Sequence, residues 1–250
     1  MTTRGSDRDA VGDRTAASLR RVGHKGADLI APGNTLGSFD AALGAGVDMI
    51  EFDVLPEREG SDRLILAHDY RAAARGIPTT LEEGLAHFAS AAFDGIELDV
   101  DLKLPGYEDR VVGALRDHGL VHRALVSSQY TESLARVRAI EPALPLGWSV
   151  PKLRRDYTAS PVTALPAYAV LAGYRRALPR RAAAALRAGR CDALMAHWRL
   201  VTPRLVSAVR AADGELYAWT VDELPRIRAL EALGVTGVIS NDPRLFAALA

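Results

Sequence analysis

Short apolar segments alternate with amphipathic segments along most of this chain, and this alternation restricts its fold more than any other feature. Eight segments have the length and the apolar, β-prone composition of strands: residues 21–24, 47–55, 95–103, 124–128, 145–149, 192–197, 215–220 and 237–240. Apolar residues recur at helical spacing between most of them, at 35–44, 109–118, 131–140, 203–212 and 223–233. Such alternation favours a mostly parallel sheet covered by helices.

Eight strand–helix units in 250 residues match the size of a (β/α)8 barrel, the TIM barrel. The competing α/β architecture is an open doubly wound sheet, which usually has a glycine-rich turn after its first strand. The sequence GHKGA at 23–27 does not have that spacing. We therefore expect a TIM barrel, with one short hairpin excursion over residues 56–68 after the second strand. Gly60 and Ser61 would lie at the turn of that hairpin.

The chain shows neither a linker nor an internal repeat, so we expect a single domain over residues 21–250. Residues 1–20 are polar and charged, which predicts a disordered N-terminal tail without the apolar centre of a signal peptide. No segment approaches the roughly 18 apolar residues of a membrane-spanning helix. The single cysteine, Cys191, excludes an internal disulfide and suits a reducing compartment, so a cytoplasmic location is expected.

The charge balance argues against a nucleic-acid partner, because 31 Lys and Arg residues face 31 Asp and Glu residues. One local exception is the arginine-rich segment 173–181, GYRRALPRR. Its simplest interpretation is a solvated helix face, and it would also permit peripheral contact with an anionic membrane surface. The sequence indicates no oligomeric state.

Acidic side chains share one face of two of the expected strands. In MIEFDVL, Glu51 and Asp53 alternate with apolar residues, and in IELDVDLKL Asp99, Asp101 and Lys103 do the same. The apolar face of a barrel strand packs against the helices, so these charges would point into the barrel. Internal salt bridges with Lys103 are one explanation. The favoured explanation is a bound hard cation such as Mg²⁺ or Ca²⁺. Two strands offer acids near their C-terminal ends, which is where barrel enzymes have their active sites.

Two histidines should lie at the same end of the barrel as the acids. His24 follows the first strand, and His68 ends the returning segment of the hairpin. Imidazole titrates near neutral pH, so a pair of histidines across a metal suits general acid and base roles. The adjacent Lys25 and a metal would suit an anionic oxygen such as that of a phosphate.

The ordered motifs of this chain resemble those of the glycerophosphodiester phosphodiesterases. That family has His-Arg-Gly, Glu-Asn-Thr, Glu-x-Asp, His-Asp after a hairpin, and acid-x-Lys. The matching sequences here are GHKGADLIAPGNTLGSFDAALGAGVDMIEFDV, LILAHD and DLK, followed in order by AWTVD and GVISNDP. The resemblance covers about residues 21–245 and implies a (β/α)8 barrel that hydrolyses a phosphodiester with a divalent metal, Mg²⁺ or Ca²⁺.

The resemblance also implies a role for each matching residue. The catalytic acid and base would be His24 and His68; the metal ligands Glu51, Asp53 and Asp101; and the substrate-binding residues Lys25, Lys103 and Trp219. The expected substrate is a small glycerophosphodiester such as glycerophosphocholine, cleaved to glycerol 3-phosphate and an alcohol. In the mechanism that the family suggests, a substrate hydroxyl next to the diester attacks the phosphorus, and water then opens a cyclic phosphate.

Several positions depart from the family pattern. Lys25 replaces the usual arginine and loses its bidentate geometry. Gly33 stands where the family often has glutamate, although Asn34 is retained. Only nine residues separate Asp69 from Thr79, where many relatives carry a longer insertion that recognises the alcohol. Asn241 replaces a common acid, with little expected effect.

Three other functions stay open from the sequence. A lysophospholipase D-like activity would need an apolar channel for an acyl chain. A barrel without turnover could act as a binding protein, although both histidines, the acids and Lys103 are retained. A metal-assisted lyase or aldolase is compatible with the same fold. Weaker site candidates are Asp99, as support for Lys103 or the metal, Gln129 and His197.

Overall fold

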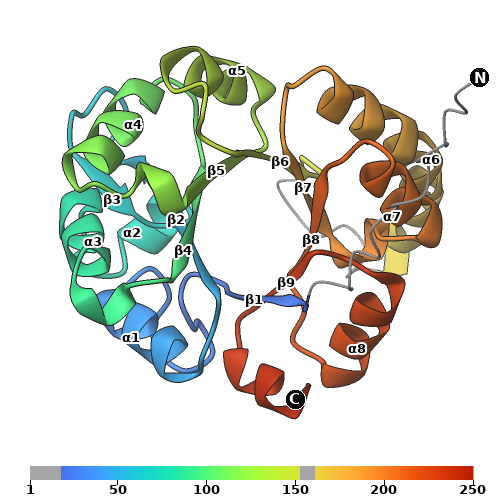
Figure 1. Ribbon diagram of the computed structural model, residues 1–250, viewed down its shortest axis with the longest axis horizontal. Coiled ribbons are helices and arrows are strands. Elements are labelled where there is room, and N and C mark those ends of the chain that lie inside the picture. The colour runs from blue at the N-terminus through green and yellow to red at the C-terminus, as the bar shows by residue number, and fades with distance from the viewer. Residues whose placement is uncertain (1–17, 153–160, 250) are drawn as a thin grey trace, which may run out of the picture.

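A closed parallel barrel forms the centre of the computed structural model, which describes residues 18–152 and 161–249 (Figure 1). Its strands follow the order β1-β9-β8-β7-β6-β5-β4-β2, and pairing of β1 with β2 closes the ring. Their bounds are β1 Arg20–Gly23, β2 Met49–Pro56, β4 Glu97–Leu102, β5 Ala124–Ser128, β6 Leu146–Val150, β7 Ala193–His197, β8 Glu215–Trp219 and β9 Gly237–Ser240. These eight parallel strands confirm the predicted TIM barrel.

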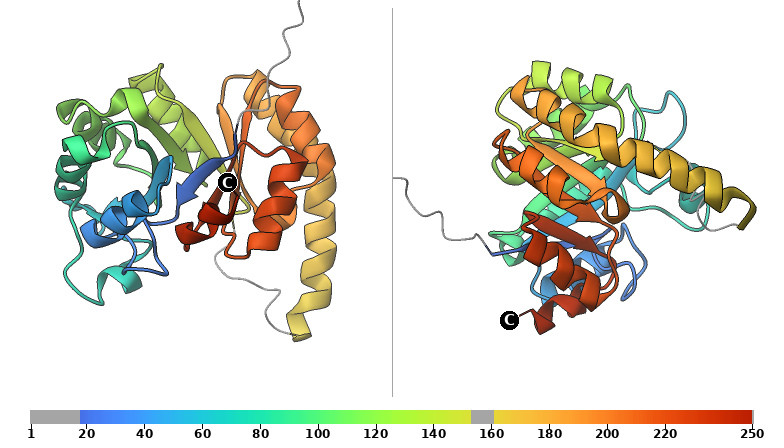
Figure 2. Two further views of the ribbon diagram at one scale, coloured as in Figure 1. Left: turned by 60° about the horizontal axis from the view of Figure 1, so that its bottom comes forward. Right: turned by 90° about the vertical axis from the view of Figure 1, so that its right-hand side faces the viewer.

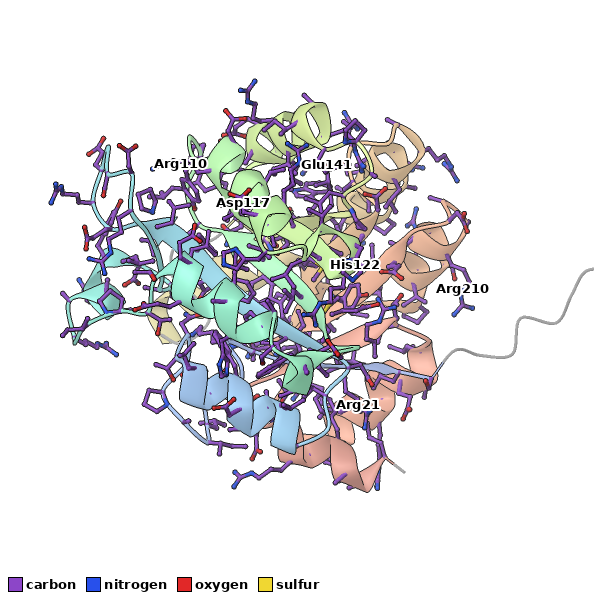
Figure 3. All side chains as sticks on the ribbon, turned by 60° about the vertical axis from the view of Figure 1, so that its left-hand side comes forward. Arg21, Arg110, Asp117, His122, Glu141 and Arg210 are labelled. Carbon is purple, nitrogen blue, oxygen red and sulfur yellow. The ribbon has the colours of Figure 1, made fainter. Side chains whose placement is uncertain are left out.

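Helices between the strands cover the outside of the barrel (Figure 1). The α-helices are α1 Leu36–Gly44, α2 Tyr70–Ala73, α3 Leu81–Phe88, α4 Glu108–Asp117, α5 Thr131–Ile140, α6 Pro161–Arg187, α7 Pro203–Arg210 and α8 Leu224–Leu233. Short 3-10 turns span Ala91–Phe93, Val121–Arg123, Trp198–Leu200 and Pro243–Ala248. Charged side chains such as Arg110, Asp117 and Glu141 lie on this outer layer (Figure 3).

The core lies between the strands and the helices, as the alternation in the sequence predicts. On β2, Ile50, Phe52 and Val54 are fully buried on the outward face. Phe52 stacks on Phe88 of α3 with ring centroids 5.2 Å apart, and Phe88 contacts Phe39 of α1 at 4.6 Å. Since apolar residues occupy this face, the intervening polar residues of β2 and β4 must point into the barrel.

The predicted hairpin after the second strand is confirmed. β3, Leu64–Leu66, pairs antiparallel with β2, with Val54 opposite Leu66. Gly60 adopts a positive φ of 73° at the turn, which suits glycine. The hairpin returns the chain to the C-terminal end of β2, and His68 therefore lies near the acids of that strand.

β1 begins at Arg20 and Leu19 is buried, whereas residues 1–17 of the predicted tail lie outside the described residues. The N-terminal half of α6 extends past the end of the barrel (Figure 2). In its second half Arg175, Arg176 and Arg180 are exposed, as a solvated helix face requires. Among the described helices, none has the length and apolarity to cross a bilayer.

Candidate active site

The polar residues predicted to act together converge on one cavity at the C-terminal ends of the strands. The cavity has a volume of about 210 Å³. Of the eight predicted site residues, seven line it and the eighth, Asp53, is fully buried beneath them. The lining residues are His24, Lys25, Glu51, His68, Asp99, Asp101, Lys103, Ser127, Gln129, Ser149, Met195, Trp219, Thr220 and Ile239.

Three carboxylates from β2 and β4 form a cluster that could hold a metal ion. Glu51, Asp53 and Asp101 each offer an oxygen, and these oxygens lie within 4.8 Å of one another. The strand register creates this cluster because it pairs Asp53 with Asp101. Oδ1 of Asp101 is buried without a hydrogen-bond partner, whereas Oδ1 of Asp53 contacts Nζ of Lys103. An all-oxygen donor set with an unsatisfied buried oxygen fits a hard divalent cation, Mg²⁺ or Ca²⁺ alike.

Lys103 places an ammonium group directly beside this cluster. Its Nζ lies 2.5 Å from an oxygen of Asp101 and forms an ion pair with Asp53. Burial opposes charge on Lys103, but Asp101 and Asp53 raise its pKa well above the usual value. The predicted salt bridges therefore exist in the same place as the predicted metal ligands.

The acids divide into two electrostatic classes. Burial opposes ionisation of Asp53, but Lys103 together with the nearby histidines lowers its pKa. Burial, followed by the charge of Asp53, raises the pKa of Glu51 well above its usual value. Burial and the neighbouring Asp101 raise the pKa of Asp99 to about 8. The single ammonium thus does not keep all of these acids ionised, and a divalent cation at the cluster would favour their ionised forms.

The loop after β1 positions two of the carboxylates. The backbone N–H of Lys25 donates to Oε2 of Glu51 at 2.8 Å. Asn34 makes two hydrogen bonds with Asp53: its Nδ2 donates at 2.8 Å, and its Oδ1 accepts from the backbone N–H at 3.0 Å. Gly26 has a φ of 84°, and a Cβ there would meet Ser38 at 2.6 Å. The turn therefore requires glycine at this position.

Hydrogen bonds fix the ring of His24 in one orientation. The Nδ2 of Asn241 donates to Asp222 at 2.7 Å, so the Oδ1 of Asn241 faces Nδ1 of His24 at 2.5 Å. Since Oδ1 can only accept, Nδ1 carries the proton and Nε2 is left for the cavity. Nε2 lies 3.8 Å from Oε2 of Glu51. Burial and the nearby Lys25 lower the pKa of His24 to about 4, which favours a neutral ring at pH 7.

His68 lines the same cavity in a more open position. Its side chain is 54% exposed, compared with 19% for His24. Its Nδ1 lies 3.4 Å from Oδ2 of Asp69. Asp69 is itself held in place as the N-cap of α2, because it accepts the backbone N–H of Ala72 at 2.7 Å. The two histidines thus differ in access to solvent as well as in hydrogen bonding.

The glycine at position 33 makes room for a carboxylate from elsewhere in the same loop. Asp28 accepts the backbone N–H of Gly33 at 2.9 Å and lies 3.3 Å from Nζ of Lys25. A Cβ at position 33 would meet Oδ1 of Asp28 at 2.5 Å. The related family often has a glutamate at the position of Gly33. In this chain Asp28 places a carboxylate beside that position.

The remaining wall of the cavity comes from the second half of the barrel. Trp219 lines it and donates from Nε1 to the backbone oxygen of Met195 at 2.9 Å. His197 packs edge-on against Trp219, with ring centroids 5.3 Å apart. Gln129 lines the cavity as suggested, whereas Ser127, Ser149 and Thr220 were not foreseen. The alternation of inward and outward side chains along β5 and β6 could have predicted Ser127 and Ser149.

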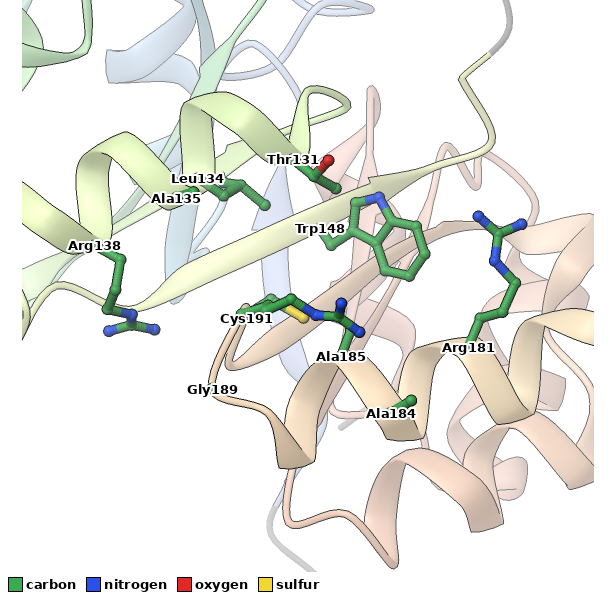
Figure 4. A pocket seen from close by; sticks show the side chains of 11 residues that line it. Thr131, Leu134, Ala135, Arg138, Trp148, Arg181, Ala184, Ala185, Gly189 and Cys191 are labelled. Atoms are coloured by element: carbon green, nitrogen blue, oxygen red, sulfur yellow. The ribbon is translucent and has the colours of Figure 1, made fainter.

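A separate cavity of about 530 Å³ lies between α5 and α6, on the outer face of β6 (Figure 4). Trp148 forms its floor, and Arg138 and Arg181 lie at its edges. Along β6, Trp148 faces this outer cavity while the next residue, Ser149, faces the barrel cavity. The outer cavity contains none of the predicted site residues, so the reactive groups belong to the barrel cavity.

Comparison with known proteins identifies relatives along most of the chain. The sequence model of the glycerophosphoryl diester phosphodiesterase family matches residues 24–76 and 105–245. The gap between these segments contains Asp101 and Lys103, whose place in the site follows from the strand register. A glycerophosphodiester phosphodiesterase of Caldanaerobacter subterraneus is 23% identical over 89% of this chain and 93% of its own length. One from Bacillus subtilis is 25% identical over 90% and 84%.

Solved structures of similar fold include proteins described as phosphodiesterases. A glycerophosphodiester phosphodiesterase from Agrobacterium tumefaciens has a TM-score of 0.64 at 19% identity, covering 92% of this chain and 99% of its own. A phosphodiesterase from Oleispira antarctica, solved with its product sn-glycerol-3-phosphate, has a TM-score of 0.66 at 20% identity, covering 92% and 97%. At these identities the structures establish the shared barrel fold.

Proposed function

This chain belongs to the glycerophosphoryl diester phosphodiesterase family, and we propose that it hydrolyses a small glycerophosphodiester to glycerol 3-phosphate and an alcohol. One observation carries the proposal: a triad of carboxylates, two histidines and two lysines meet at a single cavity. The product complex of the Oleispira antarctica protein supports the choice of glycerol 3-phosphate as product. Glycerophosphocholine is the substrate that we would test first.

The proposed metal ligands are Glu51, Asp53 and Asp101. A divalent cation at this position would supply positive charge for the phosphate oxygens of the substrate. Lys25 adds a second positive charge at the cavity wall, on the side of His24. Lys103 is already paired with two carboxylates, so its first contribution is to keep those ligands ionised and in place.

The proposed proton transfers follow the different surroundings of the two histidines. Nε2 of the buried His24 is free to accept the proton of the attacking substrate hydroxyl. The more exposed His68 is placed to protonate the alcohol that leaves towards solvent. In the hydrolysis that follows, the new P–O ring bond is opened by water, and the two histidines exchange roles.

A direct assay of glycerophosphocholine hydrolysis tests this proposal. Release of choline and glycerol 3-phosphate would be followed with Mg²⁺, with Ca²⁺ and with a chelator. We expect metal-dependent release, and a loss of about 10²–10⁴-fold in kcat for His24→Ala and for His68→Ala. His122→Ala is the matched control, because His122 is exposed in the 3-10 turn before β5. Turnover that survives chelation, or that both active-site variants retain, would refute the proposal.

A further inference from the structure

The helices outside the barrel leave one residue of β6 partly uncovered. Outward-facing residues of a barrel strand normally lie under the helices, and Leu146 and Val150 of β6 are 0% and 1% exposed. Trp148 shares their face of the strand but is only partly buried. It forms the floor of the outer cavity of about 530 Å³ between α5 and α6 (Figure 4). The indole therefore offers an aromatic surface to a molecule in that cavity.

Small side chains on the two flanking helices leave this space beside the indole. Ala135 of α5 and Ala184 and Ala185 of α6 line the cavity (Figure 4). Its volume falls within the range of roughly 300–1,000 Å³ that is common for small-molecule sites. The outer cavity is thus large enough for a ligand whose ring system stacks on Trp148.

The charges of the outer cavity have one sign. Among the described residues, the charged side chains that line it are three arginines, Arg138, Arg181 and Arg190. Arg138 forms an ion pair with Asp192, whereas no acid in the described part of the chain pairs with Arg181 or Arg190. The guanidinium carbon of Arg181 lies 5.8 Å from the ring centroid of Trp148. Two cations without carboxylate partners, one of them beside an aromatic surface, favour a doubly negative aromatic ligand.

We propose that the outer cavity binds an aromatic phosphate, with its planar ring on Trp148 and its phosphate against Arg181 and Arg190. A nucleoside monophosphate is a ligand of this class. Its phosphate carries close to two negative charges at neutral pH, which matches the two arginines. Guanidinium groups bind phosphate oxygens in a bidentate manner, and every base has a π-face that can stack on an indole. The site therefore selects a class of ligand rather than one particular base.

This site goes beyond the phosphodiesterase function, although it borders the same strands. Trp148 lines the outer cavity and the next residue, Ser149, lines the barrel cavity. Thr131, at the start of α5, lines the outer cavity, and Gln129 two positions earlier lines the barrel cavity. No lining residue is shared, so binding in the outer cavity requires neither the carboxylate cluster nor the histidines. The two proposals can therefore fail separately.

Calorimetric titration of the whole protein with adenosine 5′-monophosphate (AMP), adenosine and inorganic phosphate tests the proposal. A chelator is present, so that no metal recruits phosphate to the barrel cavity. We expect AMP to bind at least about tenfold more tightly than adenosine or phosphate, because stacking and guanidinium contacts both contribute. Arg181→Gln should weaken AMP binding on the order of tenfold. Arg187→Gln should leave it unchanged, because Arg187 is an exposed residue of α6 that is not among the lining residues.

The fluorescence of Trp148 gives a second measurement. A stacked base should quench it, and this quenching should disappear in Trp148→Phe, whose smaller ring can still stack. Lys25→Ala removes a cation of the barrel cavity and should not change AMP binding.

Three results would overturn the proposal. Adenosine that binds as tightly as AMP would show that the phosphate is not recognised, and phosphate that binds as tightly as AMP would show the same for the ring. An unchanged AMP affinity in folded Arg181→Gln protein would exclude the cation assigned to the phosphate. A loss of AMP binding in Lys25→Ala would place AMP in the barrel cavity. Hydrolysis of glycerophosphocholine is measured in a separate assay, so each of these results leaves the phosphodiesterase function untouched.

Discussion

The two halves of the barrel differ in what they contribute to the cavity. From β1 to β4, the strands and their following loops supply every charged residue that lines it, including both lysines and the acids. From β5 to β9, the lining consists of neutral residues such as Ser127, Ser149, Met195 and Trp219. The difference indicates that the first half holds the reactive groups, whereas the second half shapes the cavity and orients one of the histidines.

The charged half is also the half in which removal of one group leaves others without a partner. Lys103 is the clearest case, because Asp53 and Asp101 both depend on it in the metal-free protein. Lys152, which follows β6 in the neutral half, lies over the ring of Tyr130 in a cation–π interaction, with its Nζ 3.8 Å from the ring centroid. Paired substitutions across the two halves can therefore separate reactive from shaping residues.

The largest effect is expected from Lys103→Met in metal-free protein. It leaves two buried carboxylates without their cation, which costs about 3–5 kcal/mol in the free energy of unfolding. Lys152→Met should cost less than about 1 kcal/mol, since Lys152 is exposed and its contact with Tyr130 is a cation–π interaction. Urea titration in the presence of a chelator measures both values. Equal losses for the two variants would contradict the contrast between the halves.

A second contrast concerns turnover and metal affinity. Asp53→Asn removes one of three proposed ligands while Asn34 can still hold the side chain, so we expect kcat/KM to fall at least about a hundredfold. Ser149→Ala, on the neutral wall, should change kcat/KM by less than about tenfold. Steady-state assays combined with metal titration calorimetry measure both. If Asp53→Asn binds metal as tightly as the unmodified protein, the ligand assignment is wrong.

The sequence made the charged half largely predictable, and the reason is local. In GHKG, EFD, AHD and DLK the functional residues lie within a few positions of one another, at or next to strand ends. Strand alternation then decides which side chains face inward, and parallel pairing brings neighbouring strand ends together. The eight-stranded barrel and the hairpin were predictable from the same two rules.

Contacts across distant segments were not predictable in this way. Asp28 beside Gly33 depends on the path of the loop, and no spacing in the sequence indicates that path. Asn241 was expected to matter little, yet its Oδ1 lies 2.5 Å from Nδ1 of His24, 217 positions earlier in the chain. Only closure of the barrel, which pairs β1 with β9, creates that contact.

The Asp222–Asn241–His24 chain of hydrogen bonds gives a third, smaller prediction. Asn241→Leu removes the acceptor for Nδ1 of His24, and we expect kcat to fall about 10–100-fold, as when the outer partner of a functional histidine is lost. In Asn241→Asp alone, the new carboxylate lies beside the carboxylate of Asp222. In the double variant with Asp222→Asn, the residue at 241 accepts from His24 and the residue at 222 donates to it. The double variant should therefore recover most of the activity. Nitrogen NMR of the His24 ring should show mixed tautomers in Asn241→Leu alone, and no such change would contradict the positioning role.

The smallest expected effect concerns the pH dependence of stability without metal. The pKa of Asp99 is raised to about 8, above its unfolded value of about 3.8, so the folded state binds its proton more tightly. The stability of the metal-free protein should therefore fall as pH rises from about 4 to 8. We expect calorimetry in chelator to show a Tm lower by at least ~2 °C at pH 8 than at pH 6, and a smaller difference in Asp99→Asn. A Tm that rises over this interval would contradict the electrostatic description.

Anomalous diffraction from a crystal soaked with Mn²⁺ and glycerol 3-phosphate tests most directly whether the charged half is the reaction centre. Mn²⁺ accepts the same carboxylate ligands as Mg²⁺ and Ca²⁺ and can be located by its scattering. The expected result is one peak bound by Glu51, Asp53 and Asp101, with the phosphate against Lys25 and between the two histidines. A metal peak elsewhere, or a phosphate bound away from His24 and His68, would contradict the central claim.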